Sequence, residues 1–189
     1  HTNTNLACLA MKFNHLPILQ HAHAYLRLIE PDDLPVWAAY LRLPQVYQHT
    51  SWNLQAVSEL EPHLASRQVH QPDSPFRLAI ACPHSHVLLG TIGFHTVSAL
   101  NKSAELAYDL APEAWGCGIA SSAAMTMTDW AHAQAGIIRV QATVLESNER
   151  SMAVLQRCGF VREGLLASYR QVRGQSGNFV MFSHVLQSA

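Results

Sequence analysis

Charged residues are scarce in this sequence of 189 residues. Asp, Glu, Lys and Arg make up 13% of it, about half of the usual share of roughly 25%. The 12 Lys and Arg nearly balance the 13 Asp and Glu, which leaves a net charge of -1. Proteins that bind nucleic acid through its phosphates normally carry an excess or a stripe of positive charge. No nucleic-acid partner is therefore expected.

The sequence also lacks a disulfide framework and a metal-binding motif. Its cysteines, Cys8, Cys82, Cys117 and Cys158, are far apart and form no Cys-x-x-Cys pair. Reduced thiols in a cytoplasmic protein are the simplest interpretation. The 12 histidines are numerous, but the pairs at 21 and 23 and at 84 and 86 have no Cys, Asp or Glu at ligand spacing. No metal is expected.

Long apolar runs are missing as well. None approaches the ~20 residues that cross a bilayer, so no membrane span is expected. Lys12 follows the short apolar stretch 6–11, which is not the pattern of a signal peptide. Met11 is a plausible native start, and residues 1–24 are expected to be an N-terminal extension that can include residues added for expression. The length suits one domain, expected over residues 25–187.

The periodicity of apolar residues predicts an α+β domain with one central mixed sheet. Strands are expected at 25–29, 76–81, 87–97, 104–110, 137–145, 160–172 and 178–186, and helices at 31–41, 54–69, 119–135 and 148–157. A Pro- and Asp-containing turn is expected at 72–75. The order strand, glycine loop, long helix, strand in the middle of the chain is a crossover unit, in which the two strands lie parallel.

The glycine loop carries the clearest chemical signal. Gly116 and Gly118 lie between a predicted strand and a predicted helix, and consecutive N–H groups at a helix start bind anions such as phosphate. No Gly-Lys-Ser/Thr follows and a third glycine is missing, so the loop fits neither the P-loop nor the dinucleotide fingerprint. A tight turn without a ligand is the alternative.

A second informative stretch lies at 148–160. Asn148 is a good N-cap, Ser151 follows in the first turn, and Gly159 ends the predicted helix. Alone, this pattern indicates only a capped amphipathic helix.

The two stretches become specific when they are combined with their neighbours. The segments Ala104–Leu110, Trp115–Ala120, Asn148-x-x-Ser151 and Cys158–Gly164 resemble, in order and spacing, the GNAT superfamily of acyl-CoA N-acyltransferases. Within it they resemble the Rim-type branch, which contains ribosomal-protein N-terminal acetyltransferases. The resemblance extends from about Tyr25 to Leu186. It implies one GNAT-type domain with a central, mostly antiparallel sheet, helices on both faces, and splayed central strands that hold CoA.

The resemblance also implies a cofactor site, with acetyl-CoA as co-substrate. Its pyrophosphate would lie on the N–H groups of Gly116, Cys117, Gly118, Ile119, Ala120 and Ser121. Its pantetheine arm would pair with the backbone of Asp109 and Leu110, beside a bulge, and Asn148 would hydrogen-bond the pantetheine or acetyl region. Trp115 stands where the family often has Gln or Arg. It could cover the cofactor or pack on the helix.

The expected chemistry is direct transfer of the acetyl group to an amine. Glu105 is the candidate base, either with a pKa raised by burial or through a water molecule, and a salt-bridge role is the alternative. Ser151 is the candidate acid for the leaving thiolate, with Tyr108 and Tyr169 as alternatives. Cys117 is interpreted as a tolerated small residue, not a nucleophile.

The acceptor is expected to be a primary amine, either a protein N-terminus or a small molecule such as an aminoglycoside, a polyamine or an amino acid. Residues 31–69 and the loop 168–178 are expected to select it. A cationic acceptor usually needs clustered acids, and Asp32, Asp33, Glu59, Glu61 and Asp73 are available. A non-catalytic acyl-CoA-binding or sensing domain on the same fold is the alternative; in that case Glu105 and Ser151 would face away from the cleft. A homodimer through the C-terminal strands stays open.

Overall fold

Seven strands form one sheet in the computed structural model, which describes residues 15–68 and 75–187. The strands are β1 (Tyr25–Leu28), β2 (Phe76–Ala81), β3 (Leu88–Ser98), β4 (Ser103–Leu110), β5 (Arg139–Leu145), β6 (Val161–Val172) and β7 (Gln175–Val185). Their order in the sheet is β1-β2-β3-β4-β5-β7-β6. Only β4 and β5 pair in parallel, and the other neighbours are antiparallel. The predicted α+β class with a mixed, mostly antiparallel sheet is confirmed.

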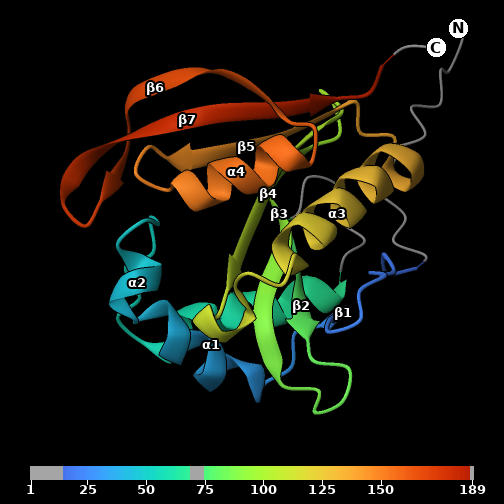
Figure 1. Cartoon of the computed structure of the whole chain (residues 1–189), viewed down its shortest axis with the longest axis vertical. Coiled ribbons are helices and arrows are strands. Elements are labelled where there is room, and N and C mark those ends of the chain that lie inside the picture. The colour runs from blue at the N-terminus through green and yellow to red at the C-terminus, as the bar shows by residue number, and fades with distance from the viewer. Residues whose placement is uncertain (1–14, 69–74, 188–189) are drawn as a thin grey trace, which may run out of the picture.

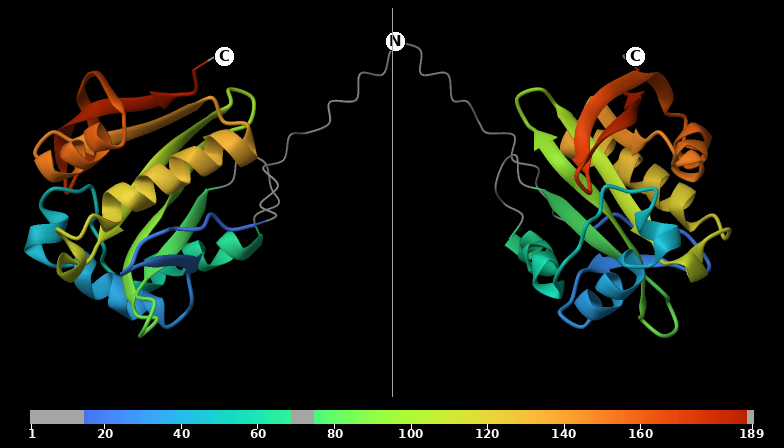
Figure 2. Two further views of the ribbon diagram at one scale, coloured as in Figure 1. Left: turned by 45° about the vertical axis from the view of Figure 1, so that its right-hand side comes forward. Right: turned by 90° about the vertical axis from the view of Figure 1, so that its left-hand side faces the viewer.

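Helices cover both faces of this sheet (Figures 1 and 2). They are α1 (Asp33–Leu41), α2 (Pro44–Tyr47), α3 (Ile119–Ala135) and α4 (Glu149–Arg157), with 3-10 segments η1 (Val57–Gln68) and η2 (Pro112–Ala114). One apolar cluster joins α3 and α4 to the sheet through buried residues such as Met127 and Leu155. A second joins α1, α2 and η1 to the sheet around Trp37 and Leu60. Each face therefore has its own core.

The parallel pair β4–β5 is unusually short. It comprises only the pairs Ser103–Arg139, Ala104–Val140 and Glu105–Gln141. Beyond them β4 continues to Leu110 and β5 to Leu145, and the two strands diverge (Figure 1). Backbone groups that normally pair with a neighbouring strand therefore face a gap in the middle of the sheet. This is the predicted splay.

A bulge lies in β3 at His95. Phe94 pairs with Leu106 and Thr96 with Glu105, so His95 is an extra residue opposite β4. A second irregularity lies between β2 and β3, where Ile80 pairs with Gly90 but Ala81 pairs with Leu88, so that Leu89 is an extra residue. Gly90 is the partner of Leu110 on β4, so this second bulge lies close to Asp109 and Leu110, beside which a bulge was expected.

Two local features differ from the sequence expectation, and a third is not tested. The helix expected at 54–69 is the 3-10 segment η1, which contains Pro62; a proline inside an α-helix removes a hydrogen bond and clashes with the preceding turn. Pro44 follows the end of α1 and also begins α2, a position that proline favours. Most of the turn expected at 72–75 lies outside the described residues.

The segment before β1 contributes to the core. Leu19 is 6% exposed and Ala24 is 1% exposed, and both belong to the cluster under α3. Ordered packing thus begins ahead of Tyr25. Among the residues that the structure describes, no helix is long and apolar enough to cross a membrane.

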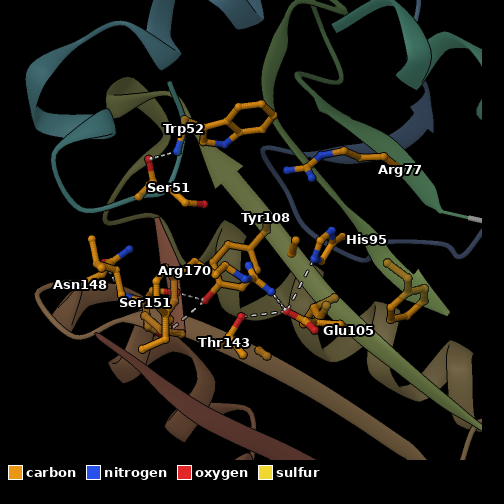
Figure 3. A pocket seen from close by; sticks show the side chains of 18 of the residues that line it. Ser51, Trp52, Arg77, His95, Glu105, Tyr108, Thr143, Asn148, Ser151 and Arg170 are labelled. Carbon is orange, nitrogen blue, oxygen red and sulfur yellow. Dashed lines mark hydrogen bonds and ion pairs between the residues drawn. The ribbon is translucent and has the colours of Figure 1, made fainter. Parts of the chain in front are cut away.

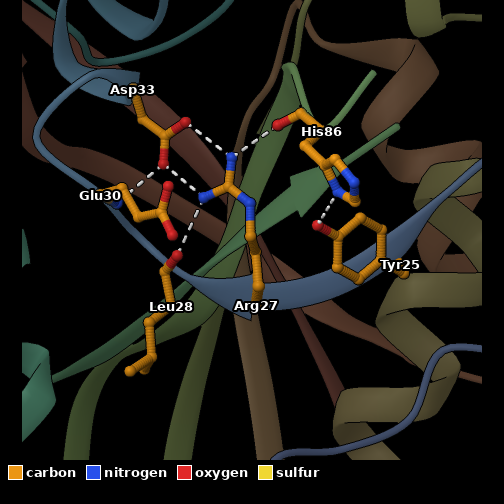
Figure 4. A network of polar contacts seen from close by, with 6 residues as sticks. All are labelled: Tyr25, Arg27, Leu28, Glu30, Asp33 and His86. Carbon is orange, nitrogen blue, oxygen red and sulfur yellow. Dashed lines mark hydrogen bonds and ion pairs between the residues drawn. The ribbon is translucent and has the colours of Figure 1, made fainter. Parts of the chain in front are cut away.

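A buried ion pair fixes β1 to the start of α1 (Figure 4). The Arg27 guanidinium donates to both carboxylate oxygens of Asp33, at 2.6 and 2.8 Å, and also to the carbonyls of Leu28 and His86. Asp33 accepts a further bond from the backbone N–H of Glu30 at 2.8 Å. One carboxylate thus holds the strand, the connection and the helix together.

We expect Asp33→Asn to destabilise the fold strongly, because it leaves the Arg27 charge without its partner. Breaking a buried pair on one side costs about 3 kcal/mol. Urea unfolding followed by circular dichroism measures the loss. Asp32→Asn is the matched control, because Asp32 is exposed one residue earlier; equal stability losses in the two variants would contradict the assignment.

Candidate functional site

A cavity of about 810 Å³ opens where β4 and β5 diverge (Figure 3). One wall consists of β4 and β5, and α4 contributes Asn148, Ser151 and Leu155. The opposite side consists of the loop after α2, η1, and the inward ends of β2 and β3. Two of the residues expected to be catalytic, Glu105 and Ser151, both line it. The cavity thus extends from the gap in the sheet to the α2–η1 loop, residues His49–Leu54. The part of the cavity under this loop is called the second chamber.

Glu105 lies in the cavity wall as a buried, fully partnered carboxylate. Its Oε1 accepts hydrogen bonds from Thr143 Oγ1 at 2.8 Å and from the Arg170 guanidinium at 2.9 Å. Burial raises the pKa of Glu105, but the Thr143 hydrogen bond and the Arg170 charge together hold that pKa below its usual value. The carboxylate is therefore ionised at neutral pH, and burial does not turn it into a strong base.

His95 lies next to Glu105 in the cavity lining (Figure 3). Its Nε2 lies 3.8 Å from Glu105 Oε1, and its side chain is 47% exposed. Burial lowers the pKa of His95 and the charges of Arg170 and Arg77 lower it further, while Glu105 opposes them. At neutral pH the imidazole is therefore uncharged.

Ser151 and Tyr108 meet on the α4 side of the cavity. The Tyr108 hydroxyl lies 2.8 Å from Ser151 Oγ. Burial raises the pKa of Tyr108, so that its hydroxyl keeps its proton. Asn148 caps α4 as expected, because its Oδ1 accepts from the Ser151 N–H at 3.1 Å. Tyr169, the other alternative acid, is 41% exposed and packs against Phe179, away from the cavity lining.

The side chain of Asp109 serves the fold rather than the cavity. It is buried among three donors: Tyr40, Arg77 at 2.7 Å and Thr91 at 2.9 Å. Arg77 in turn lies over the Trp37 ring at 5.3 Å and lines the cavity. The expected role of the Asp109 backbone toward pantetheine stays a prediction, as does that of Leu110, whose carbonyl accepts from Trp115 Nε1 at 3.0 Å.

The glycine loop forms an open helix start. Gly116 and Gly118 have φ of +78° and +76°, and a Cβ added at either would meet nothing within 4 Å. Gly118 is the N-cap of α3, so the first N–H groups of the helix lie beside open space. The Arg150 guanidinium stacks on the Trp115 ring at 3.7 Å, which joins the loop to the first turn of α4. The loop itself does not line the cavity.

Hydrogen bonds hold the α2–η1 loop over the second chamber. Arg173, in the turn between β6 and β7, donates to the carbonyls of Thr50 and Trp52, both at 2.9 Å. His49 Nδ1 lies 3.1 Å from Ser147 Oγ, in the connection before α4. The structure therefore brings together the two segments, 31–69 and 168–178, that were expected to select the acceptor.

Arg77, His95 and Arg170 are among the cavity residues that were not singled out from the sequence. Arg170 lies inside the segment 168–178, which was expected only as part of a loop that selects the acceptor. His95 reaches Glu105 through the pairing of β3 with β4, and strand pairing leaves no local signal in the sequence.

A mixed sheet splayed at its parallel pair, beside a glycine-rich helix start, defines the class of acyl-CoA-dependent acyltransferases. The family model described as "Acetyltransferase (GNAT) domain" matches residues 23–161. The chain therefore belongs to the GNAT acetyltransferase family. It is an acyl-CoA-dependent N-acetyltransferase, and acetyl-CoA is its co-substrate.

Individual proteins agree with this assignment. The N-acetyltransferase YoaA of Bacillus subtilis, described as uncharacterized, is 28% identical over 84% of this chain and 90% of its own length. The ribosomal-protein-S5-alanine acetyltransferase of Vibrio fischeri has a TM-score of 0.77 at 22% identity, over 89% of this chain and 96% of that one. The Salmonella typhimurium enzyme that modifies the N-terminal serine of ribosomal protein L7/L12 has a TM-score of 0.75 at 21% identity, over 90% and 99%. These two structures share the fold.

Among the histidines that line the cavity, His63 has the pKa with the largest shift. His63 packs on Trp37 with 5.0 Å between ring centroids. Burial, helped by the Arg77 charge, lowers the pKa of His63 to about 4. Below pH 6.5 the unfolded chain therefore binds a proton that the folded chain does not, and the folded state loses stability as the pH falls toward 4.

We expect His63→Gln to remove this part of the pH dependence. The wild type should lose up to about 2 kcal/mol more than the variant between pH 7 and pH 5. Urea unfolding at the two pH values measures the difference. His84→Gln is the control, because His84 is an exposed turn residue. Identical pH slopes for the wild type and His63→Gln would contradict the prediction.

Proposed function

We propose that this enzyme acetylates the α-amino group of a protein N-terminus by direct transfer from acetyl-CoA, as a Rim-type acetyltransferase. The single observation that carries the proposal is the cavity that joins the β4–β5 gap to the chamber under the α2–η1 loop. A thioester in the gap and an extended chain end in the chamber would meet between Glu105 and Ser151. Residues 25–187 would form the catalytic domain, and a ribosomal acceptor would place the enzyme in the cytoplasm.

The cofactor site would use the backbone more than charge. The N–H groups from Gly116 to Ser121 would hold the pyrophosphate, since Gly116 and Gly118 leave open space beside the helix start. Trp115 supplies no charge in this loop, but Arg150 stacks on it and brings a cation there. The pantetheine would pair with Asp109 and Leu110 along the unpaired edge of β4.

The Ser151–Tyr108 pair would protonate the leaving group. Acetyl-CoA supplies the acetyl group as a thioester, so transfer releases a thiolate. Because Tyr108 keeps its proton, it can donate to Ser151 Oγ at 2.8 Å. Ser151 is then free to donate its own proton to the sulfur. The Asn148 cap fixes the position of Ser151, which leaves the Asn148 amide nitrogen as a donor for the ligand.

The charges of the second chamber favour a peptide over a polycation. Asp73, one of the acids considered for a cationic acceptor, lies outside the described residues. Of the other four, only Glu59 lines the cavity, and its Oε1 already accepts from two backbone N–H groups at 2.7 and 2.9 Å. Glu105 is paired with Arg170, while Arg77 adds a further cation to the lining. An aminoglycoside or polyamine would meet little uncompensated negative charge there. An N-terminus brings only one amine.

Catalysis, rather than sensing alone, is supported by the same lining. A non-catalytic domain would have no need for an acid and a carboxylate at the cavity. Glu105 and Ser151 both line it, Glu105 from β4 and Ser151 from α4.

The acceptor class is tested by thiol release from acetyl-CoA. We expect peptides that begin with Ala or Ser to be turned over at least tenfold faster, in kcat/KM, than spermidine or kanamycin. The same peptides with a blocked N-terminus and an internal Lys are the controls, and they should give no release above background. Faster turnover of either polycation would overturn the proposal.

The proposed pyrophosphate site at the start of α3 is tested by Gly118→Ala. A Cβ there meets no protein atom but would project toward the helix start, so we expect the Kd for CoA to rise at least tenfold. The left-handed backbone costs the variant about 1 kcal/mol of stability. Gly174→Ala is the matched control, because Gly174 also has a positive φ (+81°) and open space, in the turn between β6 and β7. Isothermal titration calorimetry measures the Kd for CoA of both variants, and equal values would contradict the proposed pyrophosphate site.

A further inference from the structure

We propose that His95 is the catalytic base that takes the proton from the acceptor amine, and that Glu105 is the positioning residue that holds it. The inference rests on the proposed function for the site where the amine enters, and on the contact of His95 with Glu105 in the cavity lining for the geometry. It reassigns the expected base from Glu105 to a histidine on the neighbouring strand.

The backbone explains why His95 reaches the site. Two residues of β3, His95 and Thr96, stand opposite a single step of β4 between Leu106 and Glu105. The regular register of Phe94 with Leu106, continued by one residue, would place His95 opposite Glu105, so the pairing of β3 with β4 already brings these two residues next to each other. The bulge keeps His95 at this position, and the imidazole lines the cavity together with Glu105 (Figure 3).

The contacts of Glu105 exclude it as the stronger base. Thr143 and Arg170 both donate to Oε1, and Gln141 Nε2 lies 3.5 Å from Oε2. A proton on this carboxylate would have to compete with the neighbouring cation. The imidazole of His95 is half-exposed to the cavity and uncharged at neutral pH, so it can accept a proton directly.

The two groups form a coupled pair at 3.8 Å between His95 Nε2 and Glu105 Oε1. When His95 takes up a proton, the resulting imidazolium gains the attraction of the Glu105 carboxylate. Arg170 from β6 and Arg77 from β2 oppose this charge. These two charges lower the pKa of His95 and so favour the unprotonated imidazole before the amine arrives.

The step balances as follows. The amine nitrogen forms a bond to the acetyl carbonyl carbon, and the carbon–sulfur bond breaks with its electron pair on sulfur. His95 receives one proton from the amine nitrogen, and the thiolate receives one from Ser151, which recovers it from Tyr108. Release of the His95 proton to solvent and uptake of one proton from solvent by Tyr108 restore the enzyme, and no redox partner is needed.

The test compares His95→Ala, His95→Gln and Glu105→Gln. The acceptor is whichever of the peptides, spermidine or kanamycin the wild type turns over. We expect His95→Ala to lower kcat about 100-fold at pH 7, with an unchanged Kd for CoA. Added imidazole should restore turnover in proportion to its unprotonated fraction. Glu105→Gln should not respond to imidazole, and it should move the acidic limb of the kcat profile to lower pH because the carboxylate no longer favours the imidazolium. His84→Gln should behave as the wild type.

Retention of wild-type kcat and of the acidic limb in both His95 variants overturns the proposal. An imidazole titration by NMR provides a readout that needs no acceptor: Glu105→Gln should lower the pKa of His95, and an unchanged pKa overturns the pairing. A wrong acceptor class contradicts the proposed function alone, because the His95 comparison then uses whichever amine is turned over.

Discussion

The three-residue parallel pairing between β4 and β5 is the constraint on which the site depends. The crossover through α3 brings the two strands together at Ser103–Glu105, and the antiparallel pairing of β5 with β7 then leads β5 away from β4. The unpaired backbone groups at this gap need other hydrogen-bond partners. A ligand with an amide-containing arm can supply them, as water can, which supports the proposed position of the pantetheine.

Polar groups around this gap are divided between support and chemistry. Asp109, although it lies on the strand next to the gap, is fully engaged by Tyr40, Arg77 and Thr91 and fixes the α1 side of the sheet. Glu105, four residues earlier and on the same strand, faces the cavity. The alternative to a catalytic carboxylate, a salt-bridge partner, also describes Glu105 in part, since Arg170 pairs with it. The two descriptions are compatible if the carboxylate works by holding a neighbour.

The loop after α2 gives the enzyme its second chamber. It is held by Arg173 and by the His49–Ser147 contact, so its position depends on the β6–β7 turn and on the connection before α4. Acceptor choice and cofactor binding therefore share elements: α4 carries Ser151 on the cavity side and Arg150 toward the glycine loop. Changes in α4 are expected to affect both substrates.

The sequence by itself determined the elements and the family, because both are written in local patterns: the glycines before α3, the Asn148 cap with Ser151, and the apolar periodicity of the strands. It also singled out Glu105 and Ser151, which line one cavity. It could not place His95, which depends on the pairing of β3 with β4, or Arg170, which lies on a strand far along the chain. It also could not determine the pKa of Glu105, which Thr143 and Arg170 lower against burial. Those properties arise from contacts between distant segments, and only the tertiary structure decided them.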